Sequence, residues 1–175
     1  MAFSSEDVKR LRDLTGAGML DCKNALQEAD GDLEKAKEVL RQKGFEAAAK
    51  RAERSTAEGV VHSYIHHNRR IGALVEVNCE SDFVARTDDF RKLAHQIALQ
   101  VAAANPLYIS ADEVASGTEG DPQEVYLLEQ PFVQDESRTI RDLLSEVISK
   151  TGENIRVRRF ARFELGRYGD EATNE

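Results

Sequence analysis

The spacing of apolar residues changes once along this chain, close to residue 55, from the period of a helix to the period of a strand. Before that point apolar side chains recur every three or four residues, which is typical of one face of an α-helix. From Val60 to Cys79 they mostly alternate with polar side chains, which is typical of a strand with one buried face. A chain of 175 residues has room for a small domain followed by a larger one. The change therefore predicts one domain of residues 1–54 and a second of residues 55–175.

The first domain is predicted to be a bundle of three short helices within residues 1–44. Ser4 and Asp7 have the spacing of a capping box at the start of the first helix, and Gly16 suits the position just after its end. The third helix is expected to end before Gly44. The alanine-rich and charged residues that follow, up to about residue 54, predict a helical linker.

The second domain has the pattern of an α+β layer, in which helices cover one face of a three-stranded antiparallel sheet. Two strands flank a polar turn around Asn68 and Arg69, and apolar stripes predict helices at about 88–104 and 137–150. A final strand alternates between an apolar and a basic face. Its apolar face is expected to carry Ile155, Val157, Ala161, Phe163 and Leu165, and its basic face Arg156, Arg158 and Arg162.

Composition narrows the classes of function. The net charge of −8, from 24 basic and 32 acidic residues, argues against nonspecific binding to a phosphate backbone. No apolar run approaches the roughly 20 residues of a membrane helix, and the N-terminus lacks a signal pattern. Cys22 and Cys79 are far apart in sequence, which favours reduced thiols in a cytoplasmic protein. Whether they ever pair stays open.

Residues with chemical potential do not form a recognisable catalytic set. His62, His66, His67 and His95 lack further ligands at metal-binding spacing, so no metal site is expected. Neither cysteine has a sequence context that would activate it, and both are expected to pack in cores. No cofactor motif is present, since the glycines of residues 16–18 lack the lysine of a phosphate-binding loop. We expect a protein that is not an enzyme.

The arginine-rich final strand offers an RNA-binding alternative. Three arginines on one face, with Phe160 between them, have the makings of a surface that contacts phosphates and stacks bases. The acidic character of the whole chain weighs against this interpretation.

The segment VNCESDFVAR, residues 77–86, sets a phenylalanine beside a carboxylate between a strand and a helix. Phe83 lies outside the strand alternation and about one turn before the next helix. Two interpretations remain open. Phe83 either fills the core of its own domain or, with Asp82 beside it, is presented to a partner as an interface anchor.

Two segments together resemble a known family. LRDLTGAGMLDCKNAL (residues 11–26) and VNCESDFVAR (residues 77–86) closely resemble the signature segments of the bacterial elongation factor Ts family. Residues 30–44, 130–133 and 152–164 are also similar to segments of that family, in the same order. The resemblance implies a ubiquitin-associated type of three-helix domain and a guanine-nucleotide exchange factor for elongation factor Tu.

The resemblance also implies site residues. The family's Thr-Asp-Phe-Val segment, which intrudes beside the magnesium and phosphate site of elongation factor Tu and loosens GDP, corresponds to Ser81, Asp82, Phe83 and Val84. Serine replaces the usual threonine and keeps the hydroxyl. The N-terminal domain is implied to contact the nucleotide-binding domain of the partner. Its contact residues would be Leu11, Arg12, Thr15, Gly16, Ala17, Gly18, Met19 and Leu20.

The length of the chain resembles the short form of the family, with one core unit, which tends to form a homodimer. No direct contact with nucleic acid or membrane is implied. Two alternatives from other classes remain: a small adaptor that uses its three-helix domain, and an RNA-binding protein that uses its arginine strand. Acceleration of GDP release from elongation factor Tu would separate the exchange factor from both.

Overall fold

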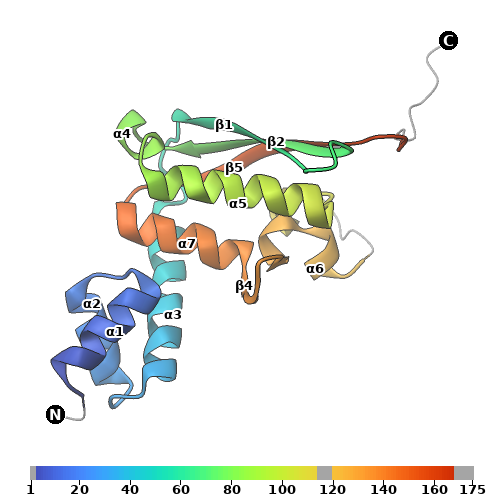
Figure 1. Cartoon of the computed structure of the whole chain (residues 1–175). Coiled ribbons are helices and arrows are strands. Elements are labelled where there is room, and N and C mark those ends of the chain that lie inside the picture. Colours follow the sequence, from blue (N-terminus) through green and yellow to red (C-terminus); the bar gives the residue numbers. More distant parts are fainter. Residues whose placement is uncertain (1–2, 114–119, 168–175) are drawn as a thin grey trace.

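An N-terminal helical bundle is joined by a long helix to a layered α+β domain (Figure 1). The structure is a computed structural model that describes residues 3–113 and 120–167. In chain order the elements are α1 (Ser5–Thr15), α2 (Met19–Glu28), α3 (Leu33–Arg51), β1 (Glu58–Ile65), β2 (Ile71–Cys79), α4 (Asp82–Ala85), α5 (Asp88–Ala104), η1 (Ala111–Glu113), α6 (Pro122–Val125), η2 (Leu127–Glu129), β3 (Pro131–Phe132), β4 (Asp135–Thr139), α7 (Ile140–Thr151) and β5 (Arg156–Glu164). The α+β class is confirmed.

The bundle begins and turns where local sequence signals place it. Ser4 and Asp7 form the predicted capping box of α1. Gly16 ends that helix in the left-handed conformation with a φ of 68°, where a side chain would be strained. Leu11 and Leu26 are fully buried in the small core between the helices.

Helix α3 continues through Gly44 to Arg51, so the prediction that it ends before Gly44 is wrong. The glycine is buried against α7, where a Cβ atom would lie 3.4 Å from Ser149 Oγ and 3.9 Å from Ser145 Cβ. Its small size thus serves the close approach of two helices. The predicted linker is the second half of α3, and Ala48 packs against the core of the α+β domain.

The main sheet has the order β1-β2-β5 with both pairs antiparallel, as predicted. Helix α5 lies against one face of the sheet, and α7 lies on the side of α5 that faces away from the sheet (Figure 1). Phe90 and Ile97 of α5 and Val75 and Val77 of β2 are fully buried or nearly so between these layers. Within the described ranges, no helix lies over the middle of the opposite face of the sheet (Figure 1).

A β-bulge in β5 reverses the second half of the predicted alternation. Val157 pairs with Val77 but Arg159 pairs with Glu76, which leaves Arg158 as the extra residue. An extra residue shifts the following side chains to the opposite face of a strand. The apolar residues Ala161, Phe163 and Leu165 are therefore exposed, and the prediction that they share the buried face of Val157 is wrong.

The segment between α5 and α7 is fastened by a buried glutamine. Gln100 of α5 donates to Gln130 Oε1 and to the carbonyl of Pro131, both at 3.1 Å, and accepts from the N–H of Val133 at 2.9 Å. Phe132 is buried beside this network. The sequence predicted a short helix after Ser110, and the described part of that stretch is the 3-10 turn η1.

Candidate partner-binding site

The Ser81–Val84 turn consists of a helix cap and the first residues of α4. Ser81 Oγ accepts a hydrogen bond from the N–H of Val84 at 3.3 Å, which starts α4. Four residues later the helix ends, and Thr87 caps α5 through its own side chain. Serine and threonine favour such cap positions. Two caps in close succession thus produce a short, sharply turned connection between β2 and α5.

Phe83 is the exposed residue of this turn. Its side chain is 76% exposed, whereas Val84 and Ala85 are buried in the core of the α+β domain. The interpretation that Phe83 fills its own core is therefore wrong. Asp82 is also exposed and forms an ion pair of 2.8 Å with Arg86, one helical turn on. Such a surface pair contributes little to stability, so Asp82 can change partners at small cost.

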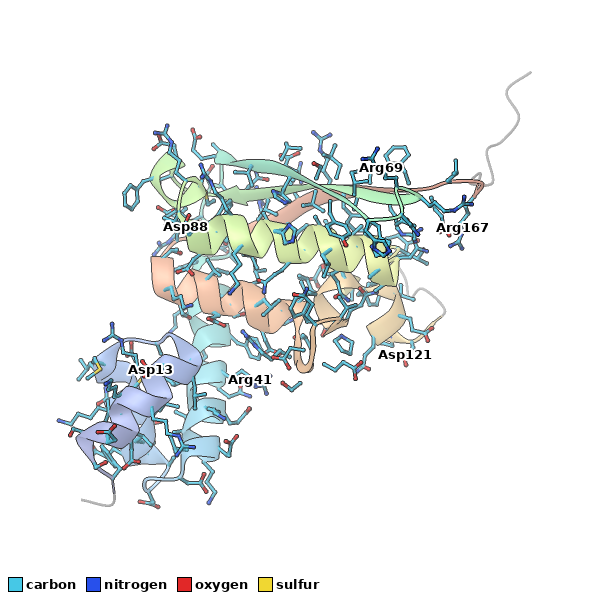
Figure 2. All side chains as sticks on the ribbon, viewed as in Figure 1. Asp13, Arg41, Arg69, Asp88, Asp121 and Arg167 are labelled. Atoms are coloured by element: carbon cyan, nitrogen blue, oxygen red, sulfur yellow. The ribbon has the colours of Figure 1, made fainter. Side chains whose placement is uncertain are left out.

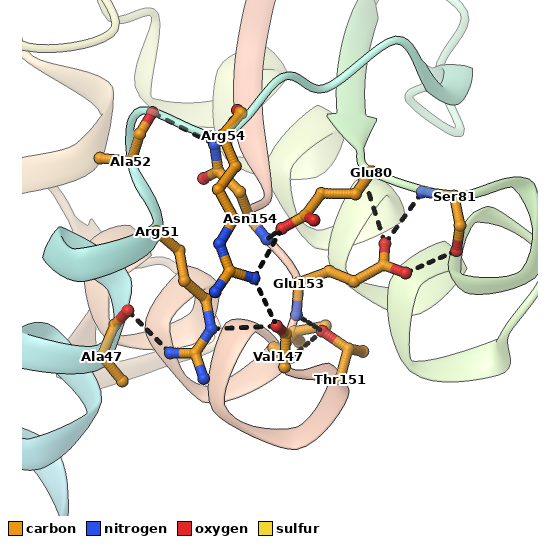
Figure 3. A network of polar contacts seen from close by, with 11 residues as sticks. Ala47, Arg51, Ala52, Arg54, Glu80, Ser81, Val147, Thr151, Glu153 and Asn154 are labelled. Atoms are coloured by element: carbon orange, nitrogen blue, oxygen red, sulfur yellow. Dashed lines mark hydrogen bonds and ion pairs between the residues drawn. The ribbon is translucent and has the colours of Figure 1, made fainter.

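A polar network lies beneath the turn (Figure 3). Glu153 Oε2 accepts from the N–H groups of Glu80 and Ser81 at 3.1 and 3.0 Å, and Glu153 Oε1 accepts from Ser81 Oγ at 2.5 Å. In the other direction, the Glu80 carboxylate accepts from the N–H of Asn154 at 2.6 Å. The sequence placed residues 152–164 in a family-like segment but gave Glu153 no role, since its partners are more than 70 residues away.

The cysteine before the turn belongs to the same structure. Cys79 is fully buried, and its thiol donates to the carbonyl of Ser81 at 3.1 Å. Burial raises the pKa of Cys79 to about 11, and the nearby Glu153 carboxylate adds to the rise. Burial also raises the pKa of Cys22. Both thiols are free and protonated near neutral pH, which fits the prediction that they pack in cores.

The contact residues predicted on the bundle divide into an exposed and a buried group. Met19 and Leu20, at the start of α2, are exposed, and so is Leu14, which the prediction omitted. Leu11 is fully buried on the inner face of α1. It cannot touch a partner, and this part of the prediction is corrected.

The remaining residues predicted on the bundle form the end of α1 and the α1–α2 turn. Thr15 Oγ1 donates to the carbonyl of Leu11 at 2.7 Å and accepts from the N–H of Ala17 at 3.3 Å, which shapes the turn. Arg12, Gly16 and Gly18 are exposed, and Ala17 is half-buried.

The bundle is held against the α+β domain from two sides. Arg41 extends from α3 toward that domain (Figure 2), and its guanidinium lies 3.4 Å from the Asp142 carboxylate of α7. Near Gly16, the Lys150 side chain of α7 fills the space that a Cβ atom would need, with Cε 2.3 Å from that position. The α1–α2 turn therefore lies directly beside α7.

The arginines of β5 do not form the predicted basic face, because the bulge separates them. Arg162 turns inward, where its Nε donates to the carbonyl of Ala102 at 3.0 Å, and Phe160 packs against the core. Arg159, on the outer face, pairs with Glu76 at 2.6 Å. The face predicted for the RNA-binding alternative, with Arg156, Arg158 and Arg162 around Phe160, is therefore not formed in the described strand.

The histidines lie on β1 (His62), in the turn after it (His66 and His67) and on α5 (His95). His62 Nε2 and His95 Nδ1 are 3.2 Å apart, and the rings of His66 and His67 are 4.2 Å apart. Across the described residues, no group of three or more His, Cys, Asp or Glu side chains is placed to hold a metal ion. No helix in the described part is long and apolar enough to cross a membrane.

The exposed apolar side chains at the bundle and at the Ser81–Val84 turn are typical of a protein that docks on another protein. The comparisons identify its family. The model of the family described as Elongation factor TS matches residues 20–120. An elongation factor Ts of Carboxydothermus hydrogenoformans is 50% identical, covering 94% of this chain and 89% of that protein.

Other relatives agree. The elongation factor Ts of Moorella thermoacetica is 49% identical, covering 94% of this chain and 96% of that protein, and that of Thermotoga maritima is 45% identical, covering 95% and 98%. The chain belongs to the elongation factor Ts family. It is a guanine-nucleotide exchange factor for elongation factor Tu in translation elongation, as the sequence predicted.

Proposed function

We propose that the Ser81–Val84 turn carries out the exchange step by inserting Phe83, with Asp82 beside it, next to the magnesium and phosphate site of elongation factor Tu. The supporting observation is that Phe83 is 76% exposed, whereas the two residues that follow it, Val84 and Ala85, are buried. A large aromatic side chain on a fixed backbone loses little conformational freedom when it docks. Phe83 is thus prepared for contact before the partner arrives.

Exchange of this kind needs no bond chemistry. The factor has only to bind the nucleotide-free partner more tightly than the GDP-bound partner, and linkage then requires that GDP and the factor weaken each other equally. Each 1.4 kcal/mol of this coupling corresponds to about tenfold in affinity. The inserted Phe83 supplies this coupling by favouring a partner conformation that lacks proper magnesium coordination.

We propose that the bundle provides a second contact, on the nucleotide-binding domain of elongation factor Tu. Leu14, Met19 and Leu20 form an exposed apolar group around the α1–α2 turn. Exposed apolar side chains that gather in one place are typical of protein–protein contacts. Arg12 and the two glycines of the turn are exposed and contribute charge and close backbone approach.

We further propose that the factor acts in the cytoplasm as a homodimer, in which the uncovered faces of two sheets pack together. Each face exposes the apolar residues Val61, Ile65, Leu74, Phe163 and Leu165. Two identical twisted sheets are able to pack face to face about a two-fold axis. A second copy would therefore cover these apolar side chains with a face of the same chemistry.

The division into residues 1–54 and 55–175 also stands as a proposal. The end of α3 and the residues just after it are bonded to the α+β part. Arg51 Nε donates to the carbonyl of Gly152 at 2.9 Å, and Asn154 Nδ2 donates to the carbonyl of Arg54 at 2.8 Å. We place the boundary after Arg54, and these hydrogen bonds attach the bundle to the α+β core.

Release of labelled GDP from elongation factor Tu tests the role of Phe83. Phe83→Ala should reduce the acceleration about tenfold or more, which corresponds to the loss of an interface anchor, while the melting temperature of the free protein stays within about 2 °C because the ring fills no core. Leu107→Ala is the control, since Leu107 is also exposed but lies far along the chain from the turn. Full exchange activity of Phe83→Ala would overturn the proposal.

A further inference from the structure

Glu153 lies directly behind the Ser81–Val84 turn, in the connection between α7 and β5 (Figure 3). All three of its hydrogen bonds to the turn reach Glu80 and Ser81, the residues that precede Asp82 and Phe83. Hydrogen bonds to a carboxylate are shorter and stronger than those between neutral groups. One side chain thus holds the backbone from which the exposed phenylalanine leaves the surface.

The hydroxyl of Ser81 depends on this contact for its orientation. A serine hydroxyl has one hydrogen and two lone pairs. Because the hydrogen is donated to Glu153 Oε1, a lone pair remains for the N–H of Val84, the bond that starts α4. A helix of four residues is too short to hold its own shape. Buried Val84 fixes one end of the turn, and Glu153 fixes the other.

Glu153 is itself placed by its neighbours on both sides. Gly152 ends α7 in the left-handed conformation, and its carbonyl accepts from Arg51 at the end of α3. Asn154 is buried and donates to the carbonyls of Ala52 and Arg54 as well as to the Glu80 carboxylate. The position of the turn is therefore tied to the end of the long helix that carries the bundle.

We propose that Glu153 is a positioning residue for nucleotide exchange, which sets the direction of Phe83 without touching the partner. This inference rests on the proposed role of Phe83. Loss of Glu153 leaves the bundle free to dock but allows the turn to move. The maximal rate of GDP release should fall, while the concentration of factor that gives half the maximal rate should change little.

Three substitutions at Glu153 separate the effect of side-chain length from the effect of charge. Glu153→Ala should lower the maximal rate of GDP release from elongation factor Tu about fivefold or more, which corresponds to the net contribution of roughly one hydrogen bond. Glu153→Gln should restore most of the rate, because its amide oxygen accepts from both N–H groups and its amide nitrogen donates to Ser81 Oγ. Glu153→Asp keeps the charge but is shorter, and should stay impaired. A ranking with Asp above Gln would overturn the positioning role.

Two further measurements distinguish a positioning role of Glu153 from a purely structural role. Amide hydrogen exchange at Glu80 and Ser81 should quicken in Glu153→Ala while amides in the middle of α5 stay protected. In the Phe83→Ala background, Glu153→Ala should cause no further loss of exchange, because it acts through the missing ring. An additional loss of the same size would show general destabilisation and overturn the inference. Glu129→Ala, which removes an ion-paired glutamate elsewhere, is the matched control.

The outcomes also separate this inference from the proposed function. If Phe83→Ala is impaired while Glu153→Ala accelerates GDP release from elongation factor Tu as well as the unmodified protein does, the positioning role is wrong and the role of Phe83 stands. If Phe83→Ala is fully active, the proposed function itself fails. Should Glu153→Ala fail to fold, the comparison of the Gln and Asp variants carries the test.

Discussion

Gly44 of α3 lies so close to Ser149 of α7 that a Cβ atom on the glycine would meet the serine Oγ at 3.4 Å. That distance is an ordinary van der Waals contact, so a methyl group fits and a larger side chain does not. Glycine inside a helix is also less favourable than alanine by about 1 kcal/mol. The contact therefore sets a sharp limit on the size of this residue.

We expect Gly44→Ala to keep or raise the free energy of unfolding by about 0.5–1 kcal/mol, and Gly44→Leu to lower it by roughly 1–3 kcal/mol through overpacking. Urea unfolding followed by circular dichroism measures both. A stable Gly44→Leu variant, with α3 still protected from hydrogen exchange, would contradict the close packing of α3 on α7.

The buried Gln100 leads to a second prediction. Gln100→Leu has similar volume but leaves the buried side-chain oxygen of Gln130 without its donor, and removes the partner of the Pro131 carbonyl and of the Val133 N–H. An unsatisfied buried group costs about 1–3 kcal/mol, so the free energy of unfolding should fall by roughly 1–3 kcal/mol. Gln123→Leu, at an exposed position, is the control and should change it by less than about 0.5 kcal/mol. Equal stability of the two variants would contradict the role of Gln100.

The buried thiol of Cys79 leads us to predict that the protein loses stability in alkali. Its folded-state pKa of about 11 lies above the ordinary value of 9.0, so the unfolded chain ionises first. The stabilising effect is complete below about pH 9 and is lost as the pH rises to about 11, with a total of about 2–3 kcal/mol. Urea unfolding of the protein and of Cys79→Ala from pH 8 to pH 11 should show a shallower pH dependence in the variant. Parallel curves would disprove this effect.

The uncovered sheet face predicts self-association. Phe163→Glu places a charge among the exposed apolar residues of that face without disturbing the monomer, since Phe163 is 71% exposed. Sedimentation equilibrium should show a dimer for the unmodified protein and a monomer for Phe163→Glu at micromolar concentration, with Leu107→Glu as the control. A monomeric unmodified protein would contradict the predicted dimer, and a dimeric Phe163→Glu variant would argue for another surface.

Local sequence signals predicted the type and order of the main elements because their causes are local. The cap at Ser4, the left-handed Gly16 and the apolar stripe of α5 each depend on residues a few positions apart. The bulge at Arg158 was not predictable in this way. It arises from pairing with β2, and a single extra residue was enough to reverse the faces of Phe160 and Phe163.

The candidate site shows the same division. The resemblance identified the Ser81–Val84 turn, but only the structure showed that Phe83 is exposed while Leu11 is not. Glu153 was missed because nothing at residue 153 indicates a partner at residue 81. Gly44 was misinterpreted because a glycine that ends a helix and a glycine that admits another helix are identical in a single sequence.

Helix α3 has 19 residues and is therefore about 28 Å long at a rise of 1.5 Å per residue. Its first half packs in the core of the bundle, and its last residue, Arg51, is bonded to the connection that holds the turn of Phe83. One continuous helix therefore joins the bundle to the support of the Phe83 turn. The factor would then recognise its partner by the distance between the two surfaces that the bundle and Phe83 contact, as well as by the chemistry of each surface. A partner in which that distance changed with the bound nucleotide would be bound tightly in one state and weakly in the other.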